Sequence, residues 1–212
     1  AHIGKCMAVC SGKITCEAYN DAVQGALRMI RYGKKDIVKQ LIKDCKTVGM
    51  GGSTTLARSG IWSMVAEDKD KTLYNSVYAA KHKEDIPAAM RKGLDADVYI
   101  TSSNAITEDG KLINIDGTGN RCAAMFYGPE KVIFVIGKNK IAENFDDAIA
   151  RIKAVACPNN AKRLKKTTPC GVIGRCTDCN SEDRMCNVTT IIERPTRGKT
   201  MHIILVDAEM GD

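Results

Sequence analysis

Four cysteines within seventeen residues are the part of this sequence that points most clearly to chemistry. Cys170, Cys176, Cys179 and Cys186 are separated by five, two and six residues, so that one C-x-x-C pair stands between two more distant cysteines. Thiolates held close together repel one another, and a bound metal ion or cluster offsets that repulsion. We therefore expect a metal centre in residues 170–186, with these four cysteines as its ligands.

The spacing bears on the kind of centre. Zinc ribbons usually present two close cysteine pairs, whereas this segment has one. Iron–sulfur clusters accept looser sets with a single C-x-x-C pair. Gly171 and Gly174 would let the loop curl around an inorganic core, and Arg175 and Arg184 would offset the thiolate charge. The spacing thus favours a [4Fe–4S] cluster. Structural zinc is one alternative. The other is that no metal binds, and that these cysteines are surface thiols or form a disulfide that holds a loop in place.

The cluster hypothesis has two forms. In one, all four cysteines bind the cluster. In the other, only Cys176, Cys179 and Cys186 do so, and a substrate or an outside ligand takes the place of Cys170. An iron left open in this way permits Lewis-acid chemistry on a hydroxy acid as well as electron transfer.

The other six cysteines do not repeat this pattern. They are a loose group near the start of the sequence and three single residues in apolar surroundings, where a buried free thiol is usual: Cys6, Cys10, Cys16, and Cys45, Cys122, Cys157. Such uneven use, in a chain with a Val/Ile-rich core, is unlike a disulfide scaffold. It suits a reducing compartment, so we expect a cytoplasmic protein.

Size and composition narrow the classes of partner. The chain has 212 residues, 44% of them hydrophobic, which is enough for one packed core, and its apolar runs are too short to cross a bilayer. The net charge of +7 is moderate, and 5% aromatic residues leave few platforms for stacking bases. We expect neither a membrane nor a nucleic acid as partner. The basic run at residues 161–166 reads as the charged end of a helix, or else as a docking surface for a redox partner protein. A homodimer is the other assembly that we consider.

Short Val/Ile-rich runs alternate with helical patterns along most of the chain. Helical patterns occupy residues 56–66, 74–92 and 144–155, and Pro87 marks a break or the start of a second helix within the second of them. Runs typical of buried strands occupy residues 46–49, 96–101, 111–115, 131–136, 189–192 and 201–206. This alternation predicts an α/β fold with a Rossmann-like sheet of mostly parallel strands flanked by helices.

The first 45 residues read mainly as helix. In this interpretation they form an N-terminal helical segment that packs on an α/β domain of residues 46–212. Two helical faces, separated at Gly33, carry the apolar residues Ala22, Val23, Ala26, Leu27 and Ile30 and then Ile37, Val38, Leu41 and Ile42. A short strand over residues 13–19 is the alternative at that point.

A glycine-rich stretch at residues 49–55 lies at a predicted strand-to-helix junction. Glycines let the backbone approach a ligand closely, and free N–H groups at the start of a helix favour an anion. The hydroxyl groups of the three residues that follow Gly52 add donors. The stretch is neither a P-loop nor a dinucleotide fingerprint, because both motifs are absent. The competing interpretation is a capped helix after a flexible turn.

Two further polar loops follow predicted strands, at residues 102–104 and 116–121. Because ligands gather at the carboxyl ends of strands in α/β sheets, we expect all three loops to meet at one edge. The second of them offers Arg121, which suits bidentate binding of a carboxylate or phosphate, although a surface arginine on a turn is an equal reading. The candidate ligand-binding residues are Gly51, Gly52, Ser53, Thr54, Thr55, Ser102, Ser103, Asn104, Asp116, Gly117, Gly119 and Asn120.

Glu108 is the nearby carboxylate that offers acid–base or nucleophilic chemistry. Judged from its surroundings alone, it is more simply a turn residue, since Asp109 and Gly110 follow it. Arg121 and Glu108 are the two candidate catalytic residues.

In this order, these stretches resemble the lactate-utilisation (LUD) domain family over about residues 46–211. The resemblance rests on VGMGGSTTL at residues 48–56, ADVYIT at 96–101, NA at 104–105, EDG at 108–110, DGTGNR at 116–121, GP at 128–129, KVI at 131–133 and HIILV at 202–206. It implies a Rossmann-like α/β fold similar to the CoA-transferase and ribose-5-phosphate isomerase group. In that group a Gly-Ser-Thr loop, here residues 51–55, holds phosphate or carboxylate, and a glutamate placed like Glu108 is a covalent nucleophile.

LUD proteins take part in the oxidation of lactate to pyruvate, as subunits beside iron–sulfur and dehydrogenase-type partners. This chain looks like a stand-alone member with its own cysteine cluster. It lacks the tight C-x-x-C-x-x-C runs of the long iron–sulfur subunit, yet it is not cysteine-poor like the short one.

Three functional hypotheses follow. The first is an iron–sulfur redox or Lewis-acid enzyme, or a subunit of one, that acts on a small carboxylate such as a 2-hydroxy acid. The second is a non-catalytic anion-binding or regulatory module with structural zinc. The third is a CoA-transferase-like enzyme that uses Glu108.

Overall fold

The centre of the fold is a six-stranded parallel sheet. In this computed structural model the described residues are 27–30 and 34–212. The strand order is β1-β10-β7-β4-β2-β3, and all five pairings are parallel. The strands are β1 (Leu27–Ile30), β2 (Thr47–Met50), β3 (Thr72–Tyr74), β4 (Val98–Thr101), β7 (Lys131–Gly137) and β10 (Thr200–Val206). The predicted α/β fold with a mostly parallel sheet is confirmed.

Both faces of the sheet are covered along its central strands, which explains why β4 and β7 are buried at nearly every position rather than at alternate ones. Along β7, Ile133 and Val135 face a core formed with α3 (Lys34–Leu41), α4 (Thr54–Ser59) and α5 (Ile61–Ala66). The residues between them, such as Phe134, face a second core on the opposite side. Each fully buried side chain of this kind contributes about 2 kcal/mol to folding.

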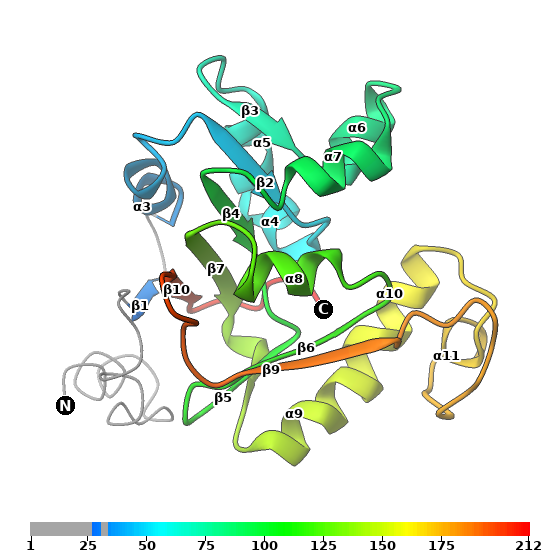
Figure 1. Cartoon of the computed structure of the whole chain (residues 1–212). Helices are drawn as coiled ribbons and strands as arrows, with labels where there is room; N and C mark the ends of the chain where they lie inside the picture. The colour runs from blue at the N-terminus through cyan, green and yellow to red at the C-terminus, as the bar shows by residue number, and fades with distance from the viewer. Residues whose placement is uncertain (1–26, 31–33) are drawn as a thin grey trace.

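A smaller mixed sheet covers that opposite side together with α8 (Asn120–Phe126) (Figure 1). Its order is β8-β5-β6-β9, and its strands are β5 (Ala105–Thr107), β6 (Leu112–Asp116), β8 (Ile141–Ala142) and β9 (Val188–Ile192). Its outer face packs on α9 (Phe145–Arg151). A helix leads on from α9 through one π-helical stretch, η2 (Ile152–Ala156), into α10 (Cys157–Arg163).

The remaining helices lie at the ends of the strands. A 3-10 turn, η1 (Lys138–Lys140), follows β7, and α6 (Ser76–Lys81) and α7 (Ile86–Lys92) follow β3. The short helix α11 (Pro169–Ile173) carries the first cysteine of the cysteine segment and packs beside α10 (Figure 1). No helix in the described part of the chain has the length and apolar character needed to cross a membrane.

Three expectations about the elements need correction. Leu27 and Ile30 belong to a strand, β1, and not to a helix, because a short apolar run fits either element and pairing with β10 decides it. The expected helix over residues 56–66 is split at Gly60, whose φ of 70° ends α4 and begins α5. In the segment over residues 74–92, Tyr74 ends a strand and does not begin a helix, whereas the expected start of a second helix at Pro87 is confirmed, because Pro87 lies in the first turn of α7.

The second expected N-terminal helix is present as α3, which places Val38 and Ile42 in the core. Several other sequence expectations lie outside the described residues: the strand over residues 13–19, the helical positions Ala22, Val23 and Ala26, and Cys6, Cys10 and Cys16.

Gly49 permits the closest approach between β2 and its neighbours. A Cβ atom at this position would lie 2.6 Å from the carbonyl oxygen of Gly93 and 2.6 Å from Cδ2 of Tyr99. Contacts that short require the backbone or a buried ring to move. Packing therefore requires a glycine at position 49, and this close packing also fixes the position of the loop that follows β2.

We expect Gly49→Ala to lower the free energy of unfolding by about 1–3 kcal/mol, because it overpacks the sheet. Chemical denaturation measures this. Gly52→Ala is the matched control, since its added Cβ would meet only Val77 Cγ2 at 3.7 Å and Ser76 Oγ at 3.9 Å. Equal unfolding midpoints for the two variants would contradict the account of Gly49.

Candidate functional site

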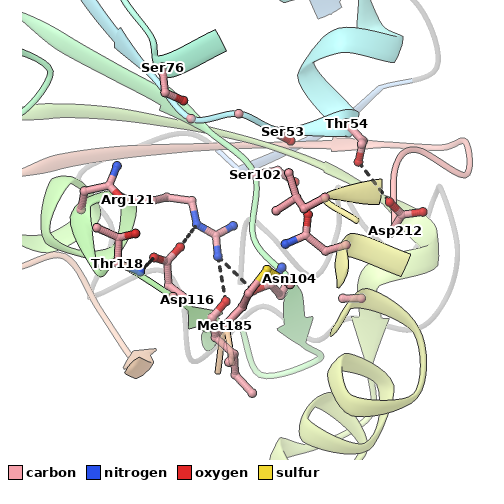
Figure 2. A pocket seen from close by; sticks show the side chains of 18 of the residues that line it. Ser53, Thr54, Ser76, Ser102, Asn104, Asp116, Thr118, Arg121, Met185 and Asp212 are labelled. Atoms are coloured by element: carbon pink, nitrogen blue, oxygen red, sulfur yellow. Dashed lines mark hydrogen bonds and ion pairs between the residues drawn. The ribbon is translucent and has the colours of Figure 1, made fainter. Parts of the chain in front are cut away.

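A polar cavity of about 440 Å³ lies at the carboxyl edge of the parallel sheet. Segments that follow five of its six strands line it: residues 51–54 after β2, 75–76 after β3, 102–104 after β4, Lys140 after β7 and Asp212 beyond β10. Figure 2 shows side chains from several of these segments around the space. Parallel strands end their loops on one side of the sheet, so the topology itself gathers these residues.

The glycine-rich loop is held rigidly against this cavity. Ser53 caps α4, with its Oγ accepting a hydrogen bond of 3.4 Å from the backbone N–H of Leu56. Asn75 is buried and donates from Nδ2 to the carbonyl oxygens of Met50, at 2.8 Å, and Gly51, at 3.3 Å. The capped-helix interpretation is thus correct in part, although the loop does line a cavity. Asn75 was missed, because the strand that it follows, β3, was not predicted from the sequence.

Arg121 connects two of the predicted loops (Figure 2). Its Nε donates to Oδ2 of Asp116 at 3.0 Å, and one terminal nitrogen donates to Oδ1 of Asn104 and to the carbonyl oxygen of Ile115, each at 3.1 Å. Asp116 also accepts from the backbone N–H of Gly119 at 2.7 Å. The carboxylate offsets the charge of the guanidinium group, and the arginine serves first to hold the loops together.

Most of the predicted ligand-binding residues line this cavity. They are Gly51, Gly52, Ser53, Thr54, Ser102, Ser103, Asn104, Asp116, Gly117 and Asn120, and Arg121 lines it as well. Two others lie just behind the lining. Thr55 is fully buried and its hydroxyl donates to the carbonyl oxygen of Met210 at 3.1 Å, while Gly119 caps α8 with a φ of 84°.

Glu108 is not among the residues that line the cavity. It follows β5 at the end remote from Asn104, roughly 13 Å further along the chain at strand rise. Its backbone N–H donates to the carbonyl oxygen of Ala142 at 2.9 Å. The structure therefore does not bring Glu108 together with Arg121.

Lys140 is a buried lysine that the sequence analysis did not find. Its residue is 4% exposed, it lines the cavity, and its Nζ donates to Oγ1 of Thr55 at 3.0 Å. Burial lowers the pKa of this ammonium group to about 7, and the positive charges of Arg151 and Arg121 act in the same direction. Asp212 opposes the shift. The residues around Lys140 in the sequence do not distinguish a buried lysine from an exposed one.

A second cavity of about 170 Å³ is lined by five thiol side chains. The four predicted cysteines, Cys170, Cys176, Cys179 and Cys186, all border it, so the fold brings the sequence cluster together. The fifth is Cys157, which the sequence suggested to be a buried single thiol. It is buried as expected, but it stands at the start of α10, where the π-helical stretch before it turns the chain.

The closest pair in this group is Cys157 and Cys186, whose Sγ atoms lie 3.6 Å apart. The contact between the two thiols, with Arg184 and Lys153 nearby, lowers the pKa of Cys186 to about 6. The same contact and burial raise the pKa of Cys157. Within residues 34–212, no three His, Cys, Asp or Glu side chains converge on a point where one metal ion could bind. The five thiols line a cavity and do not converge on a single position.

Charged side chains shape the cysteine loop. Arg184 donates to the carbonyl oxygens of Cys179, at 2.7 Å, and Cys186, at 3.1 Å. Lys166 pairs with Asp183 at 2.5 Å, and this ion pair, with a hydrogen bond from the backbone of Thr167, lowers the pKa of Asp183. The contacts of Arg184 lie within residues 170–186, and those of Asp183 attach this loop to the segment that follows α10.

The two cavities share a wall. Residues that border both are Ile115, Cys157, Arg184, Met185 and Cys186. Gly117 makes this possible, because a Cβ atom there would lie 3.3 Å from the Cα and carbonyl oxygen of Met185. Asn187 adds a hydrogen bond of 3.0 Å to the carbonyl oxygen of Gly117. The cysteine loop, residues 170–186, therefore packs directly against the loop of residues 116–121 at the polar cavity.

Comparison with known proteins bears on the family. No curated protein matches this chain. A solved structure, that of a DUF162 family protein from Deinococcus radiodurans, is similar over 81% of this chain and 94% of its own, with 12% identity and a TM-score of 0.34. The model that describes the LUD domain matches residues 34–206, which is most of the chain. The protein therefore belongs to the LUD domain family.

Proposed function

We propose that this LUD domain protein binds a small carboxylate of the 2-hydroxy-acid type in the polar cavity, beside an iron–sulfur cluster held by the thiols of the second cavity. One observation supports the proposal above the others. The polar cavity and the thiol cavity share a wall that contains Cys157 and Cys186, so an anion in the first would lie next to a cofactor in the second.

The donor set fits a cluster better than a single ion. A closed zinc site needs four ligands that converge on one point, and no three acidic, histidine or cysteine side chains do so in the described part of the chain. A four-iron cluster takes its thiolates on separate iron atoms, which suits the four predicted cysteines around this space. Cys176, Cys179 and Cys186 would hold it, with Cys170 as the fourth ligand, because the Sγ atom of Cys157 lies 3.6 Å from that of Cys186, too close for two thiolates on separate iron atoms. Such a cluster supplies electron transfer or, with an open iron, Lewis acidity.

The chain's own residues suit an anion in the polar cavity. Hydroxyl groups of Ser53 and Thr54 line it, and so do the cations Lys140 and Arg163. Asp212 also lines it, with its carboxylate accepting from Thr54 Oγ1 at 3.5 Å and from Asn159 at 3.3 Å. The surroundings are thus mixed in charge, as a hydroxy acid with both an anionic and a neutral polar end requires.

Removal of one thiol tests the cluster. Protein purified without oxygen is expected to be brown and to contain about four iron atoms per chain. We expect Cys179→Ser to lose the visible absorption and most of the iron. Iron and sulfide analysis with absorption spectroscopy measures both. Cys45→Ser is the control, because Cys45 is a buried thiol that borders neither cavity.

Other results of that analysis would count against the cluster. Colourless protein with stoichiometric zinc would replace it by a structural zinc module. Iron-free protein with a disulfide between Cys157 and Cys186 would leave a purely structural role for the thiols.

Asn75 allows a test of the carboxylate site. Asn75 and Asn144 each cap a helix, with Oδ1 accepting from backbone N–H groups, but only Asn75 also holds the glycine loop. Asn144→Ala is expected to lose about 1 kcal/mol of stability, and Asn75→Ala to lose more, because it also leaves two loop carbonyl oxygens without their donor. Only Asn75→Ala should weaken L-lactate binding, by about tenfold, because the loop carbonyls lose their donor. Titration calorimetry gives the affinities, and an equal effect of the two variants would contradict the proposal.

A further inference from the structure

Lys140 is a buried cation without a counter-ion. Its residue is 4% exposed, and no carboxylate of the described residues lies within the 4.0 Å of an ion pair from its Nζ. Its one hydrogen-bond acceptor is Oγ1 of Thr55, at 3.0 Å. An ammonium group has three donors, and a buried charge is costly unless it is paired. Part of the hydrogen-bonding capacity of the Lys140 ammonium group is therefore available to a ligand.

The other cations at the polar cavity are already engaged or hydrated. Arg121 is paired with Asp116, and Lys166 is paired with Asp183. Arg184 donates to two backbone carbonyl oxygens of the cysteine loop. Arg163 is exposed to water. Lys140 differs from all of these in being both buried and without a negative partner.

Thr55 fixes the direction of the Lys140 side chain. The threonine is fully buried, its hydroxyl donates to the carbonyl oxygen of Met210 at 3.1 Å, and its oxygen accepts from Lys140. With its own proton committed to Met210, Thr55 can only accept from the ammonium group. Two N–H donors of Lys140 remain for a ligand in the cavity that the lysine lines.

We infer that Lys140, and not Arg121, is the residue that binds the carboxylate group of the ligand in the polar cavity. This inference rests on the proposed function and names the residue that recognises the anion. Arg121 keeps a supporting position, since its contacts to Asp116, Asn104 and Ile115 hold the loops on either side.

Ligand binding would then be accompanied by uptake of a proton. The charged groups that act on Lys140 are Arg151 of α9, Arg121 of α8 and Asp212 of the C-terminal segment. Burial is the main cause that lowers its pKa to about 7, the two arginines add to it, and Asp212 opposes it. A bound carboxylate stabilises the ammonium form and raises the pKa again. Affinity should therefore be full below pH 7 and fall as the pH rises through 7 and above.

The experiment measures L-lactate binding to the intact, cluster-loaded protein by titration calorimetry between about pH 6 and pH 9. We expect a roughly 100-fold loss of affinity across that range and uptake of close to one proton per ligand near pH 8, from buffers of different ionisation enthalpy. Lys140→Met should bind at least tenfold more weakly at pH 6 and show a flat pH profile. Its melting temperature should not fall, because the variant removes a buried unpaired charge.

Lys138→Met is the matched control. Lys138 belongs to the same 3-10 turn, but its side chain is half exposed and pairs with Asp207 at 3.0 Å. It should keep both the affinity and the pH profile. Inorganic phosphate is titrated in parallel, and binding of phosphate through Lys140 without binding of L-lactate would overturn the assignment to a carboxylate.

The outcomes separate the two proposals. Lactate binding by the natural protein with unchanged affinity in Lys140→Met overturns the role of Lys140 and leaves the carboxylate site standing. No lactate binding at any pH overturns both.

Discussion

A network of buried polar side chains joins the two sheets, and both cavities depend on it. Residues 102–104 leave the parallel sheet after β4 and enter the mixed sheet at β5. There the hydroxyl of Ser103 donates to the carbonyl oxygens of Ala105, at 2.6 Å, and Ile113, at 3.2 Å. The backbone N–H of Asn104 donates to Oδ1 of Asn114, and Oδ1 of Asn104 accepts from the backbone N–H of Ile115, each at 3.0 Å. Because buried polar groups are costly when unpaired, this junction has one well-satisfied arrangement, and it fixes how β6 and its following loop meet the sheet edge.

The same network explains why so many polar residues of the site serve structure first. Arg121 reaches Asn104 and the end of β6, so the guanidinium group extends the junction to the start of α8. Asp116 offsets its charge. The site is thus built by neutralising most cations locally, which makes the few groups left without a partner informative about a ligand.

The sequence was a good guide to the parts of the fold that have a regular pattern. Runs such as Val132 to Ile136 are apolar throughout because a parallel sheet is covered on both faces, and they were assigned to strands correctly. The loops at residues 51–54 and 102–104 were placed correctly at one edge, since parallel strands end together. Residues 116–121 line the same cavity as expected, but they reach it from β6 of the mixed sheet. The prediction of a helix at Leu27 was wrong, because a run of four residues with three apolar ones has no period that separates a strand from a helix.

Some site residues are brought to the cavities by tertiary structure alone, and they could not be predicted from the sequence. Cys157, Lys140 and Asn75 come from three different elements and belong to no shared motif. Their roles follow from burial and from partners distant in the chain, such as Thr55 for Lys140 and Cys186 for Cys157. The spacing of residues along the sequence does not predict such contacts. Glu108 illustrates the converse, since proximity in sequence to Asn104 did not place it at the cavity.

The wall between the two cavities has a thermodynamic consequence. Met185 and Cys186 border both spaces, and the backbone of Met185 packs tightly against Gly117 of the neighbouring loop. A shift of this segment that enlarges one space reshapes the other, so any two occupants of these spaces would be energetically coupled. Linkage makes that coupling symmetrical: whatever one occupant does to the affinity for the second, the second does to the first by the same factor.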